Sequence, residues 1–361
     1  MELCSEEAPR FVWEGAIPLQ IHLHESEVTT LPPPPPALIL GPRIGYLPLL
    51  VPLLKPYFSS TLPPGVDTVW FDYKGLPLKW YIPTGVIFDL LCAEPERPWN
   101  LTVHFRGHPG ETLIPCESED NVKWSFINAL KEAAYIINGN CKNVMNLSQA
   151  DQFELWQSLM KGNMEGYQRI TSRLKLGPVG EDCTLKTGSG QPRQALGETD
   201  TTGFNRAGRI PVRLYVRNIS EELDDLDEAT AVDSWDSISY MNRPVEIQKL
   251  EVQHLTLRDA LKALLPEIFE DKAMSDNQVS SKEEGIQAIN SSFEDLRNTE
   301  FEETSIASES VVLAKKPKVK LIRIQGIEVD LNIPFFWVIN NLMHPDYFLH
   351  ICVFVGASSR Q

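Results

Sequence analysis

The order of strand and helix patterns constrains the fold of this chain more than any other feature, because the same order occurs twice. The first copy reads strand, strand, helix, strand, strand, helix, strand. Its strands are short alternating, β-branched or aromatic runs, and its helices are apolar segments near proline or glycine. The predicted segments are residues 11–23, 37–40, 46–58, 69–73, 78–82, 86–91 and 100–105. The five prolines at 32–36 cannot belong to a sheet, so they predict a stiff, extended connector.

The second copy follows late in the chain and has clearer signals. Thr256 is placed to cap a helix that Pro266 stops, and Pro334 is placed to open another. The predicted segments are residues 210–217, 245–252, 256–265, 319–324, 328–331, 334–342 and 348–355. This order is typical of a ubiquitin-like roll. We therefore predict an α+β protein with two ubiquitin-like (β-grasp) domains that flank a helix-rich domain.

The middle of the chain has the periodicity of helices rather than strands. Ser148 and Asp151 have the spacing of a helix start, Gly162 ends that helix, and a shorter helix follows at 164–176. A stretch rich in Gly, Thr and Ser then predicts a linker. The expected domains are residues 1–112, the first ubiquitin-like domain with an N-terminal arm; 113–180, the helix-rich domain; 181–208, the flexible linker; and 209–361, the second ubiquitin-like domain.

Two acidic segments account for most of the net charge of −16. Residues 220–242 contain eight acids and no base, and residues 267–310 contain twelve acids and three bases. The remainder of the chain is close to neutral. Both segments fall between predicted elements of the second unit, where long loops cost little, so we expect disordered insertions.

Several classes of protein are disfavoured by what the sequence lacks. Met1 is followed by acids rather than by a basic and then apolar run, and no apolar stretch reaches the roughly 18 residues of a spanning helix. A soluble, intracellular protein is therefore expected. The six cysteines lack Cys-x-x-Cys spacing, and no Gly-x-Ser-x-Gly elbow is present. We expect no metal, no cofactor and no active site of its own; for His22 and His24, a strand surface is favoured over a metal site.

The helix predicted at 119–137 carries the most interesting surface. At 100° per residue, Lys131 lies about 180° from Val122 at the start of the buried stripe. Trp124 and Tyr135 fall within about 40° of Lys131, so exposed aromatics flank an exposed amine. Geometry alone leaves two interpretations open: a docking surface for a partner, or an ordinary solvated lysine on a helix wedged between domains. Spacing by itself favours the second.

A basic cluster follows the second acidic segment directly. Its members are Lys315, Lys316, Lys318, Lys320 and Arg323. Partial neutralisation of the acidic segment is the favoured role. Contact with an anionic membrane surface is the alternative. Binding to nucleic acid is not expected.

Specific motifs across nearly the whole chain resemble the autophagy protein 5 family. The early motifs are Trp13-x-Gly15-x-Ile17-Pro18, Pro42-Arg43-x-x-Tyr46-Leu47, Gly75-x-Pro77-Leu78-Lys79-Trp80-Tyr81, Phe88-Asp89-Leu90-Leu91 and Pro98-Trp99-Asn100-Leu101. Leu130-Lys131-Glu132-Ala133 and the late block His344-Pro345-Asp346-x-Phe348-Leu349-His350-Ile351 are similar too. The resemblance implies two ubiquitin-like domains around a helix-rich one.

By this resemblance, Lys131 is the acceptor whose amine forms an isopeptide bond with the C-terminal glycine of autophagy protein 12. Trp124 and Tyr135 would then belong to a partner-docking surface. The conjugate would bind the coiled-coil autophagy protein 16 without a covalent bond, in a groove between the domains. It would meet the conjugating enzymes of the system and stimulate lipidation of autophagy protein 8 like an E3. Such a protein acts in the cytoplasm and transiently on the forming autophagosome membrane. The alternative is a non-covalent ubiquitin-like adaptor that needs no isopeptide bond.

Overall fold

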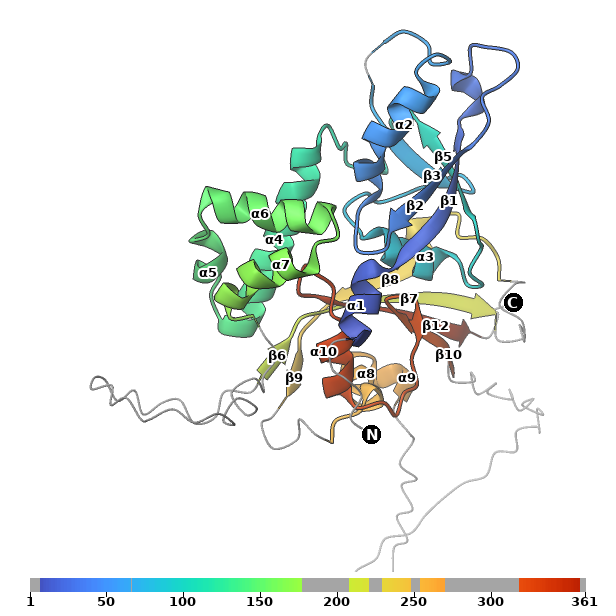
Figure 1. Cartoon of the computed structure of the whole chain (residues 1–361). Coiled ribbons are helices and arrows are strands. Elements are labelled where there is room, and N and C mark those ends of the chain that lie inside the picture. Colours follow the sequence, from blue (N-terminus) through green and yellow to red (C-terminus); the bar gives the residue numbers. More distant parts are fainter. Residues whose placement is uncertain are drawn as a thin grey trace, which may run out of the picture.

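The computed structural model describes residues 7–65, 67–176, 208–220, 229–247, 254–269 and 318–357. Two five-stranded mixed sheets and a group of helices form most of this part of the molecule (Figure 1). The sheets have the same plan, with orders β2-β1-β5-β3-β4 and β8-β7-β12-β10-β11. In each, the first strand of the unit pairs antiparallel with the second and parallel with the last. The prediction of an α+β fold with two ubiquitin-like units is confirmed.

The first ubiquitin-like unit follows the predicted order closely. Its sheet packs its inner residues, among them Ile17, Leu19 and Ile21 of β1, into a buried core. The elements are β1 (Ala16–Leu23), β2 (Ala37–Pro42), the 3-10 turn η2 (Leu47–Leu50), α2 (Val51–Phe58), β3 (Trp70–Tyr73), β4 (Leu76–Pro77), α3 (Thr84–Leu91) and β5 (Trp99–His104).

Two predictions for the first unit are wrong in detail. Residues 11–14 belong to a helix, α1 (Glu7–Glu14), because the consecutive residues Val12 and Trp13 are both buried, each in a different core. A strand would turn one of two neighbours to solvent. Residues 78–82 are not a strand either. The chain turns there, with Ile82 N donating to Lys79 O at 3.1 Å, because it must reverse to enter α3.

The second ubiquitin-like unit contains one strand that the sequence pattern does not predict. The elements are β7 (Val212–Ser220), the 3-10 turn η6 (Trp235–Ser237), β8 (Ile238–Asn242), α8 (Leu257–Leu264), α9 (Pro266–Phe269), β10 (Lys318–Ile324), β11 (Ile327–Glu328), α10 (Phe335–Leu342) and β12 (Leu349–Ala357). A separate two-stranded sheet joins β6 (Gly208–Ile210) to β9 (Val245–Ile247). The second strand of the main sheet is therefore β8, and the described residues of the strand predicted at 245–252 form β9 instead.

Part of the first predicted acidic insertion is ordered structure. Val232 and Ile238 are buried, and the indole of Trp235 donates to Pro77 O of the first unit at 2.7 Å. Asp233 and Asp236 are exposed. Their charges dominate the sequence pattern and obscure the apolar residues of the same segment, which pack inside the molecule. The prediction of a disordered loop at 220–242 is therefore wrong for 229–242. Residues 221–228, the linker at 181–207, residues 248–252 and most of the second insertion, 270–310, lie outside the described residues.

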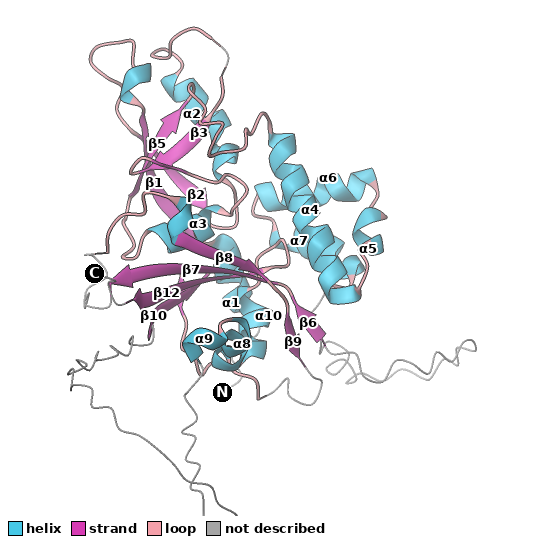
Figure 2. Cartoon of the chain, turned by 180° about the vertical axis from the view of Figure 1, so that it is seen from behind, coloured by secondary structure: helices cyan, strands magenta, loops and turns pink. Residues whose placement is uncertain are grey.

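A single helix, α3, packs against both sheets. All eight residues of α3 are buried, and its core includes Tyr215, Cys352 and Phe354 from the second sheet. The alternate residues of those strands, such as Leu214 and Val353, face the other way into a core with α8 and α10. The central strands of the second sheet are thus apolar on both faces. Figure 2 shows α3 between the two sheets.

Buried arginines of the second sheet hold the end of α3. Arg217 donates to the carbonyls of Leu90 and Leu91 at 3.1 and 2.8 Å, and Arg323 donates to the carbonyl of Cys92 at 2.7 Å. The last carbonyls of a helix lack partners within the helix and carry partial negative charge, so cations stabilise them. Arg323 therefore lies in the interior rather than in a surface basic cluster, and Lys315 and Lys316 lie outside the described residues.

A second inter-unit contact leads to a stability prediction at Gly326. Its N–H donates to Asp89 at 2.7 Å, Asp89 also pairs with Arg43, and a Cβ at Gly326 would lie 2.6 Å from Arg43 Cζ. Gly326 also has φ of 78°. We expect Gly326→Ala to lower the free energy of unfolding in urea by about 2–3 kcal/mol, because backbone strain adds to the clash.

Gly75 offers a matched control for this measurement. Its φ is 86°, but a Cβ there would meet nothing within 4 Å. Gly75→Ala should therefore cost only the backbone strain of about 1 kcal/mol. Equal losses at the two glycines would contradict the role of the Arg43 contact.

The helical group lies beside both sheets (Figure 1). It consists of α4 (Glu119–Asn138), α5 (Lys142–Met145), α6 (Gln149–Met160) and α7 (Met164–Thr171), followed by the 3-10 turn η3 (Ser172–Leu174). Phe126 and Trp156 centre its core, and Trp13, Ile44 and Tyr46 of the N-terminal part of the chain join it. None of the helices in the described part of the chain is both long and apolar enough to cross a membrane.

Candidate functional site

The helix α4 has one face in the core and one face in solvent. Ser118 and Asn121 form a capping box at its start, and Gly139, with φ of 73°, ends it. Val122, Phe126, Leu130 and Ala133 are fully buried, as the helical spacing predicts. These caps and this stripe fix which residues of α4 face outward.

The outward face brings Lys131 and Trp124 together. The Lys131 Nζ lies 5.9 Å from the centroid of the Trp124 ring and donates to Asn128 Oδ1 at 3.3 Å. Trp124 is 50% exposed and Tyr135 is 63% exposed, whereas Lys131 is half-buried. An ammonium over an indole face is stabilised by a cation–π interaction. The amine is thus held on the surface of α4 by its own neighbours, while no contact joins it to Tyr135 in the described part of the chain.

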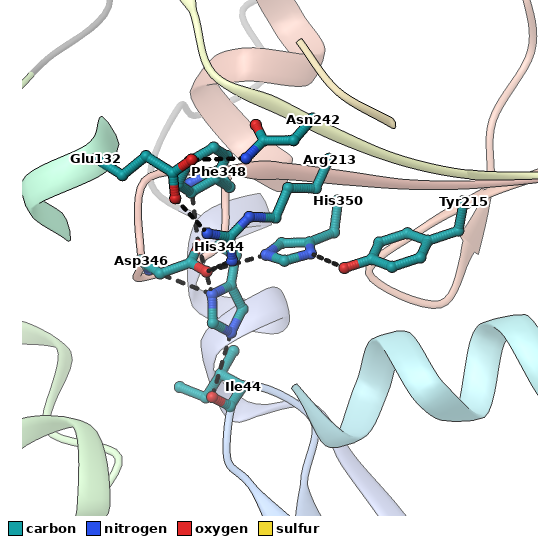
Figure 3. Close-up of polar contacts among 9 residues, drawn as sticks. All are labelled: Ile44, Glu132, Arg213, Tyr215, Asn242, His344, Asp346, Phe348 and His350. Atoms are coloured by element: carbon teal, nitrogen blue, oxygen red, sulfur yellow. Dashed lines mark hydrogen bonds and ion pairs between the residues drawn. The ribbon is translucent and has the colours of Figure 1, made fainter. Parts of the chain in front are cut away.

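Glu132, the next residue of α4, anchors the helix to the second ubiquitin-like unit. Its Oε2 accepts from Arg213 Nη2 at 2.9 Å, and its Oε1 accepts from Asn242 Nδ2 at 2.6 Å (Figure 3). Arg213 comes from β7 and Asn242 from β8, which are paired strands. Two hydrogen bonds from one sheet thus hold Glu132, the residue next to Lys131, against the second unit.

Behind Glu132, Arg213 leads into a buried polar network. Its Nη1 lies 3.5 Å from Asp346 Oδ2, and its guanidinium stacks 3.8 Å from the Phe348 ring centroid. Asp346 also accepts from Phe348 N at 3.0 Å. Burial alone would raise the pKa of Asp346, but His344 and His350 beside it outweigh burial and hold that pKa well below its usual range. The network therefore places a permanent buried anion against Arg213.

The two histidines of the network link it to more distant segments. His350 Nε2 lies 3.0 Å from Asp346 Oδ2, and its Nδ1 lies 3.3 Å from Tyr215 Oη. His344 Nε2 lies 3.2 Å from the carbonyl of Ile44 in the first unit. Figure 3 shows these contacts as one chain from Glu132 to Ile44. The helix α4 and both ubiquitin-like units thus meet in a single set of polar contacts.

These histidines and Asp346 also form a group with metal-ligand geometry. One ligand atom from each lies within 4.8 Å of the others, and it is the one such group among the described residues. Both Asp346 oxygens already accept internal hydrogen bonds, and the Arg213 cation stands beside them. A metal ion would have to displace these partners, so the group fits a structural network better than a metal site. Among the described residues, His22 and His24 belong to no such group. His24 instead stacks on His104, with ring centroids 4.3 Å apart.

The network predicts a defined loss of stability in acid. Burial lowers the pKa of His350 to about 4, despite the opposing effect of Asp346, from an ordinary value of 6.5. At pH values between these two, His350 is protonated in the unfolded chain but neutral in the folded chain. As the pH falls from 6.5 to 4, we expect His350 to cost about 3 kcal/mol of unfolding free energy, measured in urea at several pH values. The His350→Gln variant should lack this slope, and an unchanged slope would contradict the assignment.

Two cavities lie where the three parts of the molecule meet. The first has a volume of about 260 Å³ and borders Lys79, Tyr81, Ser125, Ala129, Arg213 and Tyr240. Ser125 and Ala129 are on α4, so this cavity opens beside the Glu132 anchor. The second is a groove of about 470 Å³ between α1, α7 and α10, bordered by Pro9, Trp13, Met164, Tyr167, Ile339 and Met343.

Helical spacing predicts which residues of α4 face outward, but not the contacts that hold the helix in place. Trp124 and Tyr135 are exposed on α4, as the helical spacing predicts, whereas Lys131, for which the spacing predicts exposure too, is half-buried. Arg213 and Asn242 lie 81 and 110 residues from Glu132 along the chain, and no local pattern connects them. One signal was present, because an arginine within the apolar strand β7 needs a buried partner.

Comparisons with known proteins agree with this architecture. Residues 12–105 match the family model described as autophagy protein ATG5, UblA domain. Residues 119–177 match its alpha-helical bundle region, and residues 209–353 match its UblB domain.

Curated relatives cover nearly the whole chain. Autophagy protein 5 of Oryza sativa subsp. indica is 58% identical over 364 residues, which span 99% of this chain and 96% of that protein. Autophagy protein 5 of Arabidopsis thaliana is 56% identical over 358 residues, spanning 99% and 100%. The crystal structure of Kluyveromyces marxianus Atg5 matches with a TM-score of 0.59 at 18% identity, covering 96% of this chain and 99% of that one, which supports the fold. With three family models and two near full-length relatives in agreement, the chain belongs to the autophagy protein 5 family.

Proposed function

We propose that this chain is the acceptor and scaffold of a ubiquitin-like conjugation system in autophagy, bonded through Lys131 to the C-terminal glycine of autophagy protein 12. The placement of the Lys131 amine carries the proposal. It sits on the outward face of α4, against Trp124, next to a residue locked to the second unit. An acceptor amine must be reachable and well oriented, and the outward position of Lys131 with its contact to Trp124 supports this role.

The reaction requires little of the Lys131 amine beyond this placement. The ammonium of Lys131 loses a proton, and the free amine attacks the thioester carbonyl that joins the donor glycine to a cysteine of the conjugating enzyme. An amide bond forms, the carbon–sulfur bond breaks, and the cysteine leaves as a thiolate that takes up a proton. The conjugating enzyme supplies the activated carbonyl. The acceptor chain supplies the nucleophile and its orientation.

The surroundings of Lys131 fit a docked donor domain. Trp124 and Tyr135 present aromatic surface on the same side of α4, and the cavity beside Ala129 and Tyr240 is lined by aromatic and charged groups. Aromatic residues and arginine are enriched at protein interfaces. We propose that this face holds autophagy protein 12 once the bond has formed.

The larger groove suits a second, non-covalent partner. It lies between α1, the helical group and the second ubiquitin-like unit, and its borders are largely apolar. An amphipathic helix docks into such a groove with its apolar face. We propose that autophagy protein 16 binds there, and that the assembled conjugate stimulates lipidation of autophagy protein 8 as an E3-like scaffold in the cytoplasm and at the forming membrane.

A non-covalent adaptor is the second candidate function. Trp124 and Tyr135 are exposed aromatics that can dock a partner without any bond to Lys131. In that case the ubiquitin-like units bind partners directly, and the lysine only contributes to the surface.

The state of the protein in cells separates the two functions. We would isolate the chain from autophagy-induced cells, measure its intact mass, and map any branched peptide. The proposal expects a species heavier by the mass of one ubiquitin-like protein, with the branch at Lys131. A chain found only at its own mass, while lipidation of autophagy protein 8 proceeds, would support the adaptor and contradict the acceptor.

A further inference from the structure

The five prolines at 32–36 form an exposed loop segment fixed at both ends. Before them, the N–H and Oγ1 of Thr29 donate to the carbonyl of Thr61 at 3.0 and 2.7 Å. After them, Ala37 pairs with Ile21 at the start of β2. Figure 1 shows this loop between β1 and β2 at the top of the molecule. The segment is therefore presented by a rigid sheet rather than buried in it.

The segment exposes the groups by which proline-rich ligands are bound. Leu31 is 94% exposed, and Pro32, Pro33 and Pro35 are exposed. Consecutive prolines favour a polyproline II helix with three residues per turn, which puts Pro32 and Pro35 on one edge. In the described part of the chain, the carbonyls of residues 31–35 accept no hydrogen bond. Both the rings and the carbonyls are thus free to meet a partner.

The proline segment and its flanks carry no charge. Residues 28–42 include no acid and no base. The next strand, β2, lies at the edge of its sheet and exposes Leu38 and Leu40 by 73% and 69%. Apolar side chains therefore continue beyond the prolines. Within this segment, recognition therefore depends on ring packing and on hydrogen bonds to carbonyls.

We propose that residues 31–36 are a docking peptide for a proline-recognising domain. The partner fitted to this chemistry has a groove lined by aromatic side chains, which pack against Leu31, Pro32 and Pro35 and donate Trp N–H or Tyr O–H groups to the free carbonyls. Because the prolines and the two anchors already restrict the segment, little conformational entropy is lost on binding. This role is separate from Lys131, which belongs to another unit of the molecule.

The test uses the full chain and four purified probes: an SH3 domain, a WW domain, an EVH1 domain and profilin. Calorimetric titration should show one of them binding the unmodified chain. The variant Leu31→Ser/Pro35→Ala should weaken that binding by about tenfold or more, since it removes two of the packed side chains.

A control variant makes the same two changes elsewhere in the unit. Leu53 and Pro64 are also exposed, so Leu53→Ser/Pro64→Ala should leave the affinity unchanged. Urea unfolding of both variants verifies that each is folded. Absence of binding to all four probes would overturn the proposal and leave the prolines as a spacer. Equal binding by the docking variant and the unmodified chain would overturn it as well.

Discussion

Replacing Lys131 with arginine should abolish the covalent, higher-mass form of the protein in cells. The guanidinium stays protonated at any physiological pH, so it offers no nucleophilic nitrogen to a thioester. Arginine keeps the positive charge and can stack on Trp124, so the surface of α4 is otherwise preserved. We expect the fraction of conjugated chain to fall below detection by immunoblotting and intact mass, with no change in unfolding midpoint.

The matched control is Lys142→Arg, at an exposed lysine on α5 of the same helical group. It should leave the conjugate unchanged. Persistence of the heavier species in the Lys131→Arg variant would move the acceptor to another residue. Lipidation of autophagy protein 8 that survives Lys131→Arg but is lost on substitution of Trp124 or Tyr135 would favour the non-covalent adaptor.

Replacing Arg213 with methionine should cause the largest loss of stability. Arg213 is the cation between Glu132 and Asp346, and the Asp346 side chain is only 1% exposed. Removing the guanidinium takes away the cation and leaves the buried carboxylate, among the described residues, with only its contacts to His344, His350 and Phe348 N. Breaking a buried pair in this way costs about 3–5 kcal/mol. We expect a loss of this size in the free energy of urea unfolding. Conjugation at Lys131 should fall too, because Glu132 loses a contact that orients α4.

Arg209 provides the control for that measurement. It pairs with Glu246 at 3.2 Å, but both side chains are more than half exposed. Exposed pairs contribute about 0–1 kcal/mol, so Arg209→Met should have a small effect. Similar losses for Arg209→Met and Arg213→Met would show that burial of the Asp346 carboxylate does not matter.

The parts of the fold that the sequence predicts are those with strong local signals. The helix α8 begins at Thr256 with a capping box and has the predicted apolar stripe. The sequence does not predict the strand β8, because little of it is buried and its apolar pattern is therefore weak. Ile238 is buried, while Ser239 and Tyr240 are exposed. Its place in the sheet is decided by pairing with β7, and pairing is a long-range property.

In the candidate site, too, local sequence predicts some features, while long-range contacts determine the others. Helical geometry is local, so it places Lys131, Trp124 and Tyr135 on one face of α4. The anchor of Glu132 depends on two strands that follow much later in the chain, so no window of sequence contains it. The spacing alone favoured an ordinary lysine at position 131. The proposed acceptor role of Lys131 rests on family resemblance, with the geometry around Glu132 in support.

The shared position of α3 has a consequence for how the protein is made. The helix is complete once residue 91 has been synthesised, yet part of its cover comes from Cys352 and Phe354 of β12, the last described strand. A nascent chain therefore carries a partly uncovered apolar helix through most of translation, since domains emerge from the ribosome in order. The first ubiquitin-like unit reaches its final packing only after nearly the whole chain has emerged. A product truncated before β12 should therefore expose this side of α3 and engage chaperones more than the full chain does.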